Sequence, residues 1–234
     1  MTKRAWASCD QDFIRNLTTA GIEIDSIYDI GASNGTWSWL MAQIVPRATF
    51  NLFEPLESEQ YAKNLANVLQ NRPDFRMHRI ALGSENTALK LNLHAQHVGS
   101  SLIDSEWEGV VAKQVVPVRR LDDVVTELKL PPADLIKMDV QGFELKILAG
   151  AENTCRRAKA LMIETWLYRG YGPATPLLGE IIDWMTGRDF RLVSLGNAYV
   201  APDMTLSSID AFFLRNDLMP MAAQSGVTLM GGLA

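Results

Sequence analysis

Residues 26–35 read SIYDIGASNG, an apolar run followed by a turn that carries two glycines. The run predicts a short buried strand, and Gly31 and Gly35 predict the turn after it. Apolar residues then recur at helical spacing over 37–45 and stop before Pro46, which predicts a helix. Glycines between a strand and a helix let a ligand approach the main chain closely, so this turn is a candidate binding site.

Strand-like and helix-like periodicity alternate outward from this stretch. Strands separated by helices predict parallel pairing with right-handed crossovers, and hence an α/β fold. The strands that we expect are Ser26–Ile30, Phe50–Phe53, Phe75–Leu82, Asp134–Met138 and Ala160–Ile163. The helices that we expect lie near 10–20, around Tyr61–Leu69, after a capping Asp122, around Phe143–Leu148 and around Leu177–Met185.

Two regions depart from this alternation. Leu89–Leu93 and Val115–Val118 predict two extra strands, which we interpret as a β insertion lying over the sheet, with 96–112 as a mobile loop. Two late strands, near 190–200 and 209–214, have no helix between them. Because a parallel connection needs a crossover, they must form an antiparallel hairpin.

The predicted architecture is a single domain over residues 1–234 with a doubly wound, mostly parallel sheet. The β insertion follows the third strand, and the antiparallel hairpin is C-terminal. The core covers 22–216, an N-terminal helix covers 8–20, and the tail 217–234 has no assigned role.

Composition excludes several classes of protein. The net charge of -5 provides no basic face, so nucleic acid is a poor partner. The two cysteines, Cys9 and Cys155, are far apart, which argues against a disulfide framework and fits a reducing compartment. The N-terminus lacks the apolar run of a secretory signal, and no stretch approaches the roughly 18 apolar residues of a membrane span. We therefore expect a cytoplasmic protein.

Glu54 stands directly after the second predicted strand. A carboxylate at that place can accept both ribose hydroxyl hydrogens of a ligand that contains adenosine. The glycine turn and Glu54 fit NAD and S-adenosylmethionine equally well. The dinucleotide fingerprint G-x-G-x-x-G, however, needs glycines where this chain has Ser33 and Thr36. The shorter motif favours S-adenosylmethionine, as does the C-terminal hairpin, which is typical of class I methyltransferases.

Residues 137–144, KMDVQGFE, follow the fourth main strand, whose end should face the methyl donor from the acceptor side. Asp139 is the acid best placed to orient or deprotonate an acceptor hydroxyl. Lys137 alternates with it and either holds its charge or binds the substrate, while Glu144 is a candidate to neutralise a helix N-terminus. The segment lacks the Asn/Asp-Pro-Pro-aromatic motif of base methylation and the Pro-Cys of cytosine methylation.

Glu164 and Trp166 lie at the end of the fifth predicted strand and are candidates to line an acceptor pocket, together with Ser101 in the insertion. Asp139 and Glu164 are also hard oxygen ligands of the kind that divalent cations take. Two carboxylates alone are weak evidence, and we assign no metal site. The oligomeric state has no signature in the sequence.

Seven stretches, in order over residues 26–214, resemble the FkbM family of S-adenosylmethionine-dependent methyltransferases. They are Tyr28–Ala32 with Gly35 and Ser38, Phe53–Pro55, Ala81–Gly83, Ser100–Leu102, Leu121–Asp123, Ile136–Glu144 and Asp210–Phe213. The family usually has Asn at position 33, where this chain has Ser33 followed by Asn34.

The resemblance implies O-methylation of a hydroxyl on a sugar, glycolipid or secondary metabolite, with S-adenosylhomocysteine as the second product. It also implies that Asp29, Gly31, Gly35 and Glu54 contact the cofactor, with Ser33 and Asn34 hydrogen-bonding near its methionine end. Two alternatives stay open, namely an NAD-dependent oxidoreductase on the same fold class and a non-catalytic module that binds S-adenosylmethionine.

Overall fold

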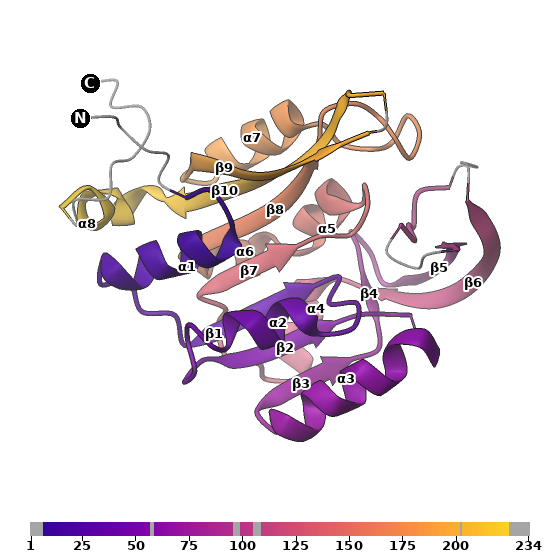
Figure 1. Ribbon diagram of the computed structural model, residues 1–234, viewed down its shortest axis with the longest axis horizontal. Coiled ribbons are helices and arrows are strands. Elements are labelled where there is room, and N and C mark those ends of the chain that lie inside the picture. The colour runs from indigo at the N-terminus through magenta and orange to yellow at the C-terminus, as the bar shows by residue number, and fades with distance from the viewer. Residues whose placement is uncertain (1–6, 57–58, 96–98, 105–108, 202, 225–234) are drawn as a thin grey trace.

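The structure is a computed structural model that describes residues 7–56, 59–95, 99–104, 109–201 and 203–224. Its main sheet has seven strands in the order β3-β2-β1-β7-β8-β10-β9 (Figure 1). Their bounds are β1 Ser26–Ile30, β2 Thr49–Phe53, β3 Phe75–His78, β7 Leu135–Met138, β8 Ala160–Trp166, β9 Phe190–Val200 and β10 Leu206–Arg215.

The first five strands in this order are parallel, and β10 runs antiparallel to both β8 and β9. The chain winds outward in one direction from β1 to β3 and in the other from β7. The switch point therefore lies between β1 and β7, where a crevice opens at the strand ends. The predicted class, a doubly wound and mostly parallel α/β sheet with a C-terminal antiparallel hairpin, is confirmed.

Helices cover both faces of this sheet (Figure 1). One apolar core contains Phe13 and Ile27, and the other contains Tyr28 and Ile147, because successive strand residues point to opposite faces. The helices on the first face are α1 Asp10–Thr19, α2 Thr36–Met41, α3 Glu59–Asn71 and α8 Met219–Gln224, which follows the 3-10 turn η1 Asn216–Leu218. Those on the second face are α4 Leu121–Glu127, α5 Glu144–Gly150, α6 Glu152–Arg157 and α7 Leu178–Thr186.

The insertion forms a separate three-stranded sheet in the order β4-β6-β5. Its strands are β4 Ala81–Leu82, β5 Thr87–His94 and β6 Val110–Arg119. It stands at the carboxyl ends of the parallel strands rather than over a face of the sheet (Figure 1), because both faces are already covered by helices. Of the expected mobile loop 96–112, residues 96–98 and 105–108 lie outside the described residues, and 110–112 belong to β6.

Two further expectations were wrong in detail. The single strand expected over Phe75–Leu82 is two strands, because the chain leaves the main sheet after His78 and β4 pairs with β6. Asp122 does not cap its own helix, since its carboxylate accepts the backbone N–H groups of Asn153 and Thr154 at the start of α6. Apolar spacing along the chain does not say which strand or helix a segment pairs with, so it could not distinguish these arrangements.

Strand β8 continues three residues past its expected end, to Trp166. Glu164 consequently lies inside the strand and pairs in register with Asp210 of β10. In the C-terminal tail, Ala222 of α8 is buried in the α1 face, and residues 225–234 lie outside the described residues. No helix within the described part of the chain is long and apolar enough to cross a membrane.

Candidate active site

The turn between β1 and α2 is built on left-handed backbone conformations. Gly31 has a φ of +79°, and a Cβ atom at this position would lie 1.9 Å from the carbonyl oxygen of Asp139. Gly35, with a φ of +76°, packs against α3 and lines no cavity that we describe below. Asn34 accepts the backbone N–H of Thr36 at 3.1 Å, which secures the start of α2. The glycines are therefore needed for close packing as well as for the turn.

Glu54 is held in place by main-chain groups at the end of β2. Its Oε2 accepts the backbone N–H of Ser33, and its Oε1 accepts that of Leu56, each at 2.9 Å. Burial raises the pKa of Glu54, while the two N–H groups act in the opposite direction. These bonds join the end of β2 to the glycine turn and fix the direction in which the carboxylate points.

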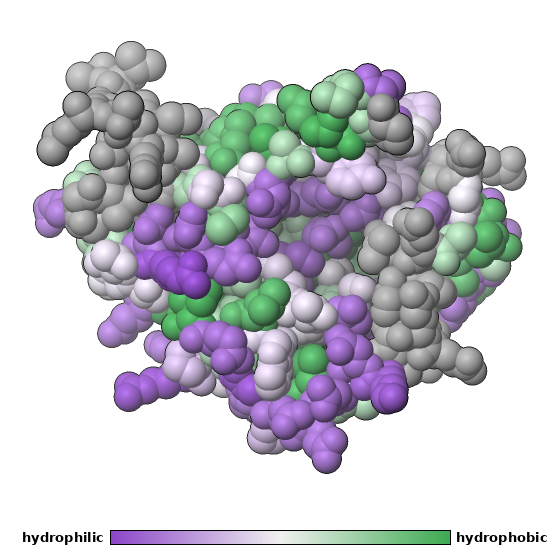
Figure 2. All heavy atoms as spheres, in the orientation of Figure 1, coloured by the Kyte–Doolittle hydropathy of each residue, from purple (hydrophilic) through white to green (hydrophobic). Residues whose placement is uncertain are grey.

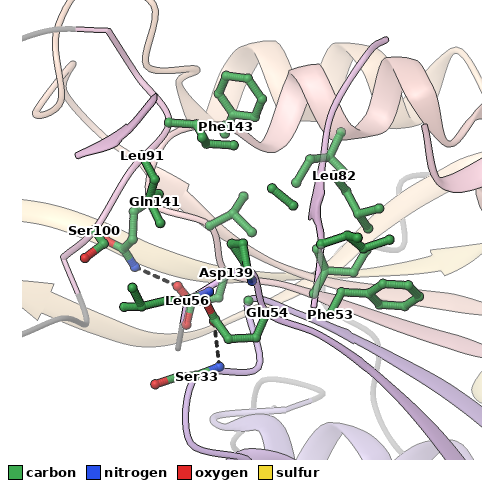
Figure 3. A pocket seen from close by; sticks show the side chains of 18 residues that line it. Ser33, Phe53, Glu54, Leu56, Leu82, Leu91, Ser100, Asp139, Gln141 and Phe143 are labelled. Carbon is green, nitrogen blue, oxygen red and sulfur yellow. Dashed lines mark hydrogen bonds between the residues drawn. The ribbon is translucent and has the colours of Figure 1, made fainter. Parts of the chain in front are cut away.

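A cavity of about 180 Å³, which we call the apolar cavity, opens beside Glu54 (Figure 3). Its apolar lining is Ile30, Phe53, Pro55, Leu56, Ile80, Ala81, Leu82, Leu91, Leu102, Val140, Phe143 and Ile147. Its remaining lining is Gly31, Ser33, Glu54, Ser100, Asp139 and Gln141. The insertion supplies part of the wall, through Leu91, Ser100 and Leu102.

A second cavity of about 210 Å³ lies on the other side of the glycine turn, and we call it the acidic cavity. It is lined by Asp10, Gly31, Ala32, Ser33, Asn34, Trp37, Lys137, Met138, Asp139, Met162, Ile163, Glu164 and Asp210. Gly31, Ser33 and Asp139 line both cavities. Figure 2 shows the molecule hollowed at this end of the sheet, with hydrophilic side chains gathered in the hollow.

Lys137 is buried at the end of β7, where it joins three parts of the site. Its Nζ donates to the carbonyl oxygen of Gly31 at 2.9 Å and lies 3.3 Å from Asp29 and 3.5 Å from Asp139. Burial alone would lower the pKa of Lys137, but the charges of Asp29 and Asp139 outweigh it and raise that pKa. Asp29 is 0% exposed, accepts the hydroxyl of Ser38 at 2.6 Å and lines neither cavity.

Gln141 joins the two predicted carboxylates of the acceptor side. Its Nε2 donates to Asp139 at 2.7 Å and to Glu164 at 2.9 Å. Burial and the neighbouring charges of Asp139 and Glu144 raise the pKa of Glu164 to about 9. Glu164 therefore holds its proton at neutral pH, because burial and the neighbouring negative charges disfavour its ionised form.

Two predicted substrate residues lie outside both cavities. The hydroxyl of Ser101 is buried and donates to the carbonyl oxygen of Gln141 at 2.6 Å, while its neighbour Ser100 lines the apolar cavity. Trp166 is 8% exposed and packs edge-on against Tyr171, with ring centroids 4.9 Å apart. Ser101 therefore contacts the main chain of Gln141, and Trp166 packs on Tyr171, whose hydroxyl donates to the Gln141 side chain.

Two acids that line the acidic cavity were missing from the sequence interpretation. Asp10 comes from α1 and accepts the indole N–H of Trp37 at 2.7 Å. Asp210 comes from β10, where burial together with Asp10 and Asp139 raises its pKa to about 7. Asp210 begins one of the quoted family stretches, which was a usable signal, whereas nothing near Asp10 indicated its place.

Among the described residues, no group of three or more His, Cys, Asp or Glu side chains is arranged to hold a metal ion. Asp139 and Glu164 lie close together, as the sequence suggested. The place between them is taken by the side-chain amide of Gln141, which donates to both.

Comparison with known proteins gives consistent matches. The model of the methyltransferase FkbM domain matches residues 29–192, which hold every site residue named above except Asp10 and Asp210. Methyltransferase 1 of Beauveria bassiana (strain ARSEF 2860) is 27% identical over 54% of this chain and 58% of its own length. The 2-O-methyltransferase NoeI of Sinorhizobium fredii (strain NBRC 101917 / NGR234) is 26% identical over 65% of this chain and 69% of its own.

Among solved structures, methyltransferase FkbM from Methylobacillus flagellatus KT is similar in fold, with a TM-score of 0.53 at 19% identity. The similarity covers 89% of this chain and 48% of that one, so this chain spans about half the length of some of its relatives. The family model itself covers well over half of this chain. The chain therefore belongs to the FkbM methyltransferase family.

Proposed function

We propose that this protein transfers a methyl group from S-adenosylmethionine to a hydroxyl oxygen of a sugar, glycolipid or secondary metabolite. The observation that carries this proposal is the position of Asp139, which lines both the apolar cavity beside Glu54 and the acidic cavity beyond the glycine turn. A side chain that lines both cavities can take a proton at the point where the methyl donor and the acceptor hydroxyl meet.

The apolar cavity suits the adenosine of the cofactor. A carboxylate has about four lone-pair sites, and among the described residues each oxygen of Glu54 accepts one backbone N–H. Two sites are therefore left for ribose hydroxyls. Ile80, Leu82 and Phe143 provide an apolar wall for the base. Ser33 and Asn34 line the acidic cavity and would hold the methionine end, whereas Asp29 would act indirectly through Lys137.

When bound, S-adenosylmethionine supplies an activated methyl group, which an acceptor oxygen takes up by in-line displacement, leaving S-adenosylhomocysteine. Asp139 is 40% exposed in its side chain and takes the hydroxyl proton as the new O–C bond forms. Lys137 lies 3.5 Å from Asp139 and helps to hold its carboxylate in place, and it anchors the glycine turn. Holding the reactants in contact supplies most of the acceleration, because the methyl group is already activated.

The acidic cavity suits an uncharged acceptor with several hydroxyls. The lysine of this cavity, Lys137, is already paired with Asp29 and Asp139, which disfavours a phosphate or carboxylate there, and Trp37 offers an apolar ring. An oxygen acceptor is also supported by the 2-O-methyltransferase NoeI, whose name describes that activity for that protein.

The proposal is tested in two steps. S-adenosylhomocysteine should bind and raise the melting temperature, and NAD should do neither. A screen of sugars and glycosylated metabolites with methyl-labelled S-adenosylmethionine should then find an acceptor, and Asp139→Asn should lower its methylation by roughly 100-fold or more. NAD binding in place of the nucleoside would support the oxidoreductase alternative instead.

The matched control is Asp183→Asn, because Asp183 is exposed on α7 and lines neither cavity. It should leave binding and turnover unchanged. Near-normal turnover of a folded Asp139→Asn would remove Asp139 as the proton acceptor. Tight binding of S-adenosylhomocysteine with no transfer to any acceptor would favour the non-catalytic binding module.

A further inference from the structure

Gln141 lies in the turn that follows β7, in a backbone conformation that few non-glycine residues adopt. Its φ is +57°, and Gly142 after it has a φ of +96°. Its carbonyl oxygen accepts the hydroxyl of Ser101 from the insertion at 2.6 Å. The turn is thereby tied to the insertion, and the side chain of Gln141 points back toward Asp139 (Figure 3).

Every atom of the Gln141 amide that can form hydrogen bonds has a side-chain partner. Its Nε2 donates to Oδ1 of Asp139 at 2.7 Å and to Oε2 of Glu164 at 2.9 Å. Its Oε1 accepts the hydroxyl of Tyr171 at 2.6 Å. The reverse orientation would point the amide oxygen at two carboxyl groups, so these partners fix which way the amide faces.

The other oxygens of the two acids are also engaged. Oδ2 of Asp139 faces Lys137 at 3.5 Å, and Oε1 of Glu164 accepts the hydroxyl of Ser208 at 3.0 Å. Each acid is thus held from two sides, and the Gln141 amide nitrogen donates to both of them. A nitrogen within 3 Å of both acids stands where a cation bridging them would have to bind.

We infer that Gln141 is a positioning residue, whose side-chain amide bridges Asp139 and Glu164 in place of a cation and aims Asp139 at the acceptor hydroxyl. This role rests on the methyl transfer proposed above, while the bridge itself does not depend on it. The amide supplies two polarised hydrogens without a charge. It can therefore hold both acids in place without withdrawing the negative charge that Asp139 needs to accept a proton.

The first test uses Mn²⁺ alone as a probe and needs no acceptor. Gln141→Glu replaces the donor by a third carboxylate, and it should bind Mn²⁺ at least tenfold more tightly than the unchanged protein, measured by calorimetry. Gln43→Glu is the matched control, because Gln43 is exposed after α2, and it should bind no better than the unchanged protein. Equal Mn²⁺ affinity of the unchanged protein and Gln141→Glu would overturn the bridge.

The second test measures positioning with the acceptor found in the screen. Gln141→Leu should leave the affinity for S-adenosylhomocysteine unchanged and lower kcat by roughly 10- to 100-fold, as expected for a displaced reacting group. The acidic limb of its pH–rate profile should move to higher pH, since two acids without a donor between them raise each other's pKa. An unaltered kcat and profile would contradict the inference.

The charged and titratable groups that face Asp139 and Glu164 are Lys137 on β7, Glu144 on α5, Asp210 on β10, Asp10 on α1 and Tyr171. Gln141→Leu leaves all of these groups in place, so a change in its pH–rate profile reports the loss of the amide.

Tyr171→Phe keeps the amide and removes only the hydroxyl that orients it. It should show the same changes in kcat and pH profile to a smaller degree, and it carries the test if Gln141→Leu does not fold. If no acceptor is ever methylated, the proposed function fails, while the Mn²⁺ comparison still decides whether the bridge exists.

Discussion

The carbonyl oxygen of Asp139 lies where a side chain at Gly31 would begin, 1.9 Å from the position of a Cβ atom. The ends of β1 and β7 are joined there by two hydrogen bonds. The N–H of Asp139 donates to Ile30 at 3.0 Å, and Nζ of Lys137 donates to Gly31 at 2.9 Å. The turn proposed to bind the cofactor and the acid proposed to accept the proton are therefore parts of one tightly packed unit.

Gly31→Ala should destabilise the protein and weaken S-adenosylhomocysteine binding. The positive φ costs about 1–3 kcal/mol for a residue with a Cβ, and the contact with Asp139 forces β1 and β7 apart as well. Urea unfolding measures the first effect and calorimetry the second. Gly179→Ala is the control, because a Cβ at Gly179 of α7 meets nothing within 4 Å. Equal stability of the two variants would show that the ends of β1 and β7 are not closely packed.

Glu54→Gln should weaken S-adenosylhomocysteine binding by tenfold or more, since hydrogen bonds to a charged group contribute roughly 1.5–3 kcal/mol. The amide nitrogen of the variant also cannot accept the N–H of Ser33 or Leu56, so the turn should loosen slightly. Titration calorimetry checks this result. The exposed Glu85, changed to Gln, is the comparison, and a similar affinity in both variants would remove Glu54 from the ribose site.

Stability should fall as the pH rises from about 5 to about 9. Glu164 holds its proton up to a pKa of about 9, while Glu144 and Asp210 do so up to about 7, against ordinary values of 4.5 for Glu and 3.8 for Asp. The folded state thus binds more protons than the unfolded state in this range, and the free energy of unfolding decreases with pH.

Between pH 7 and 9 this decrease should come mainly from Glu164, at no more than about 1.4 kcal/mol per pH unit. Glu164→Gln cannot ionise, so its unfolding free energy should be nearly constant over those two units. Urea unfolding at several pH values measures the slope, with the exposed Glu23→Gln as the control. If the unfolding free energy of Glu164→Gln falls with pH as steeply as that of the control, Glu164 is not the group that loses a proton between pH 7 and 9.

Lys137→Met should lower the free energy of unfolding by about 3–5 kcal/mol, because it leaves the buried charge of Asp29 without its counter-ion. Adding Asp29→Asn should recover part of this loss, since the amide carries no charge. Chemical denaturation of the two single variants and the double variant measures the coupling. If the two losses simply add, Lys137 and Asp29 do not stabilise each other and the lysine acts only in the site.

The sequence predicted the parts of this protein that depend on local pattern. Apolar periodicity identified the alternation of strands and helices, and the glycine turn with Glu54 identified one side of the crevice. Asp139 and Lys137 were predicted because they stand at the end of a short strand, which proved to be buried. Each of these features depends on a short stretch of sequence, in which side-chain spacing and backbone conformation are directly linked.

The tertiary structure decided which distant segments meet. Periodicity reports that a segment is buried, but not what it packs against. It could not reveal that Ala81–Leu82 joins a second sheet, or that Asp122 binds the start of α6. Asp10 and Asp210 enter the acidic cavity from elements 200 residues apart in the chain, and the Gln141 bridge needs the lengthened β8 to supply Glu164. Such contacts arise from packing whole elements together, and no local spacing encodes them.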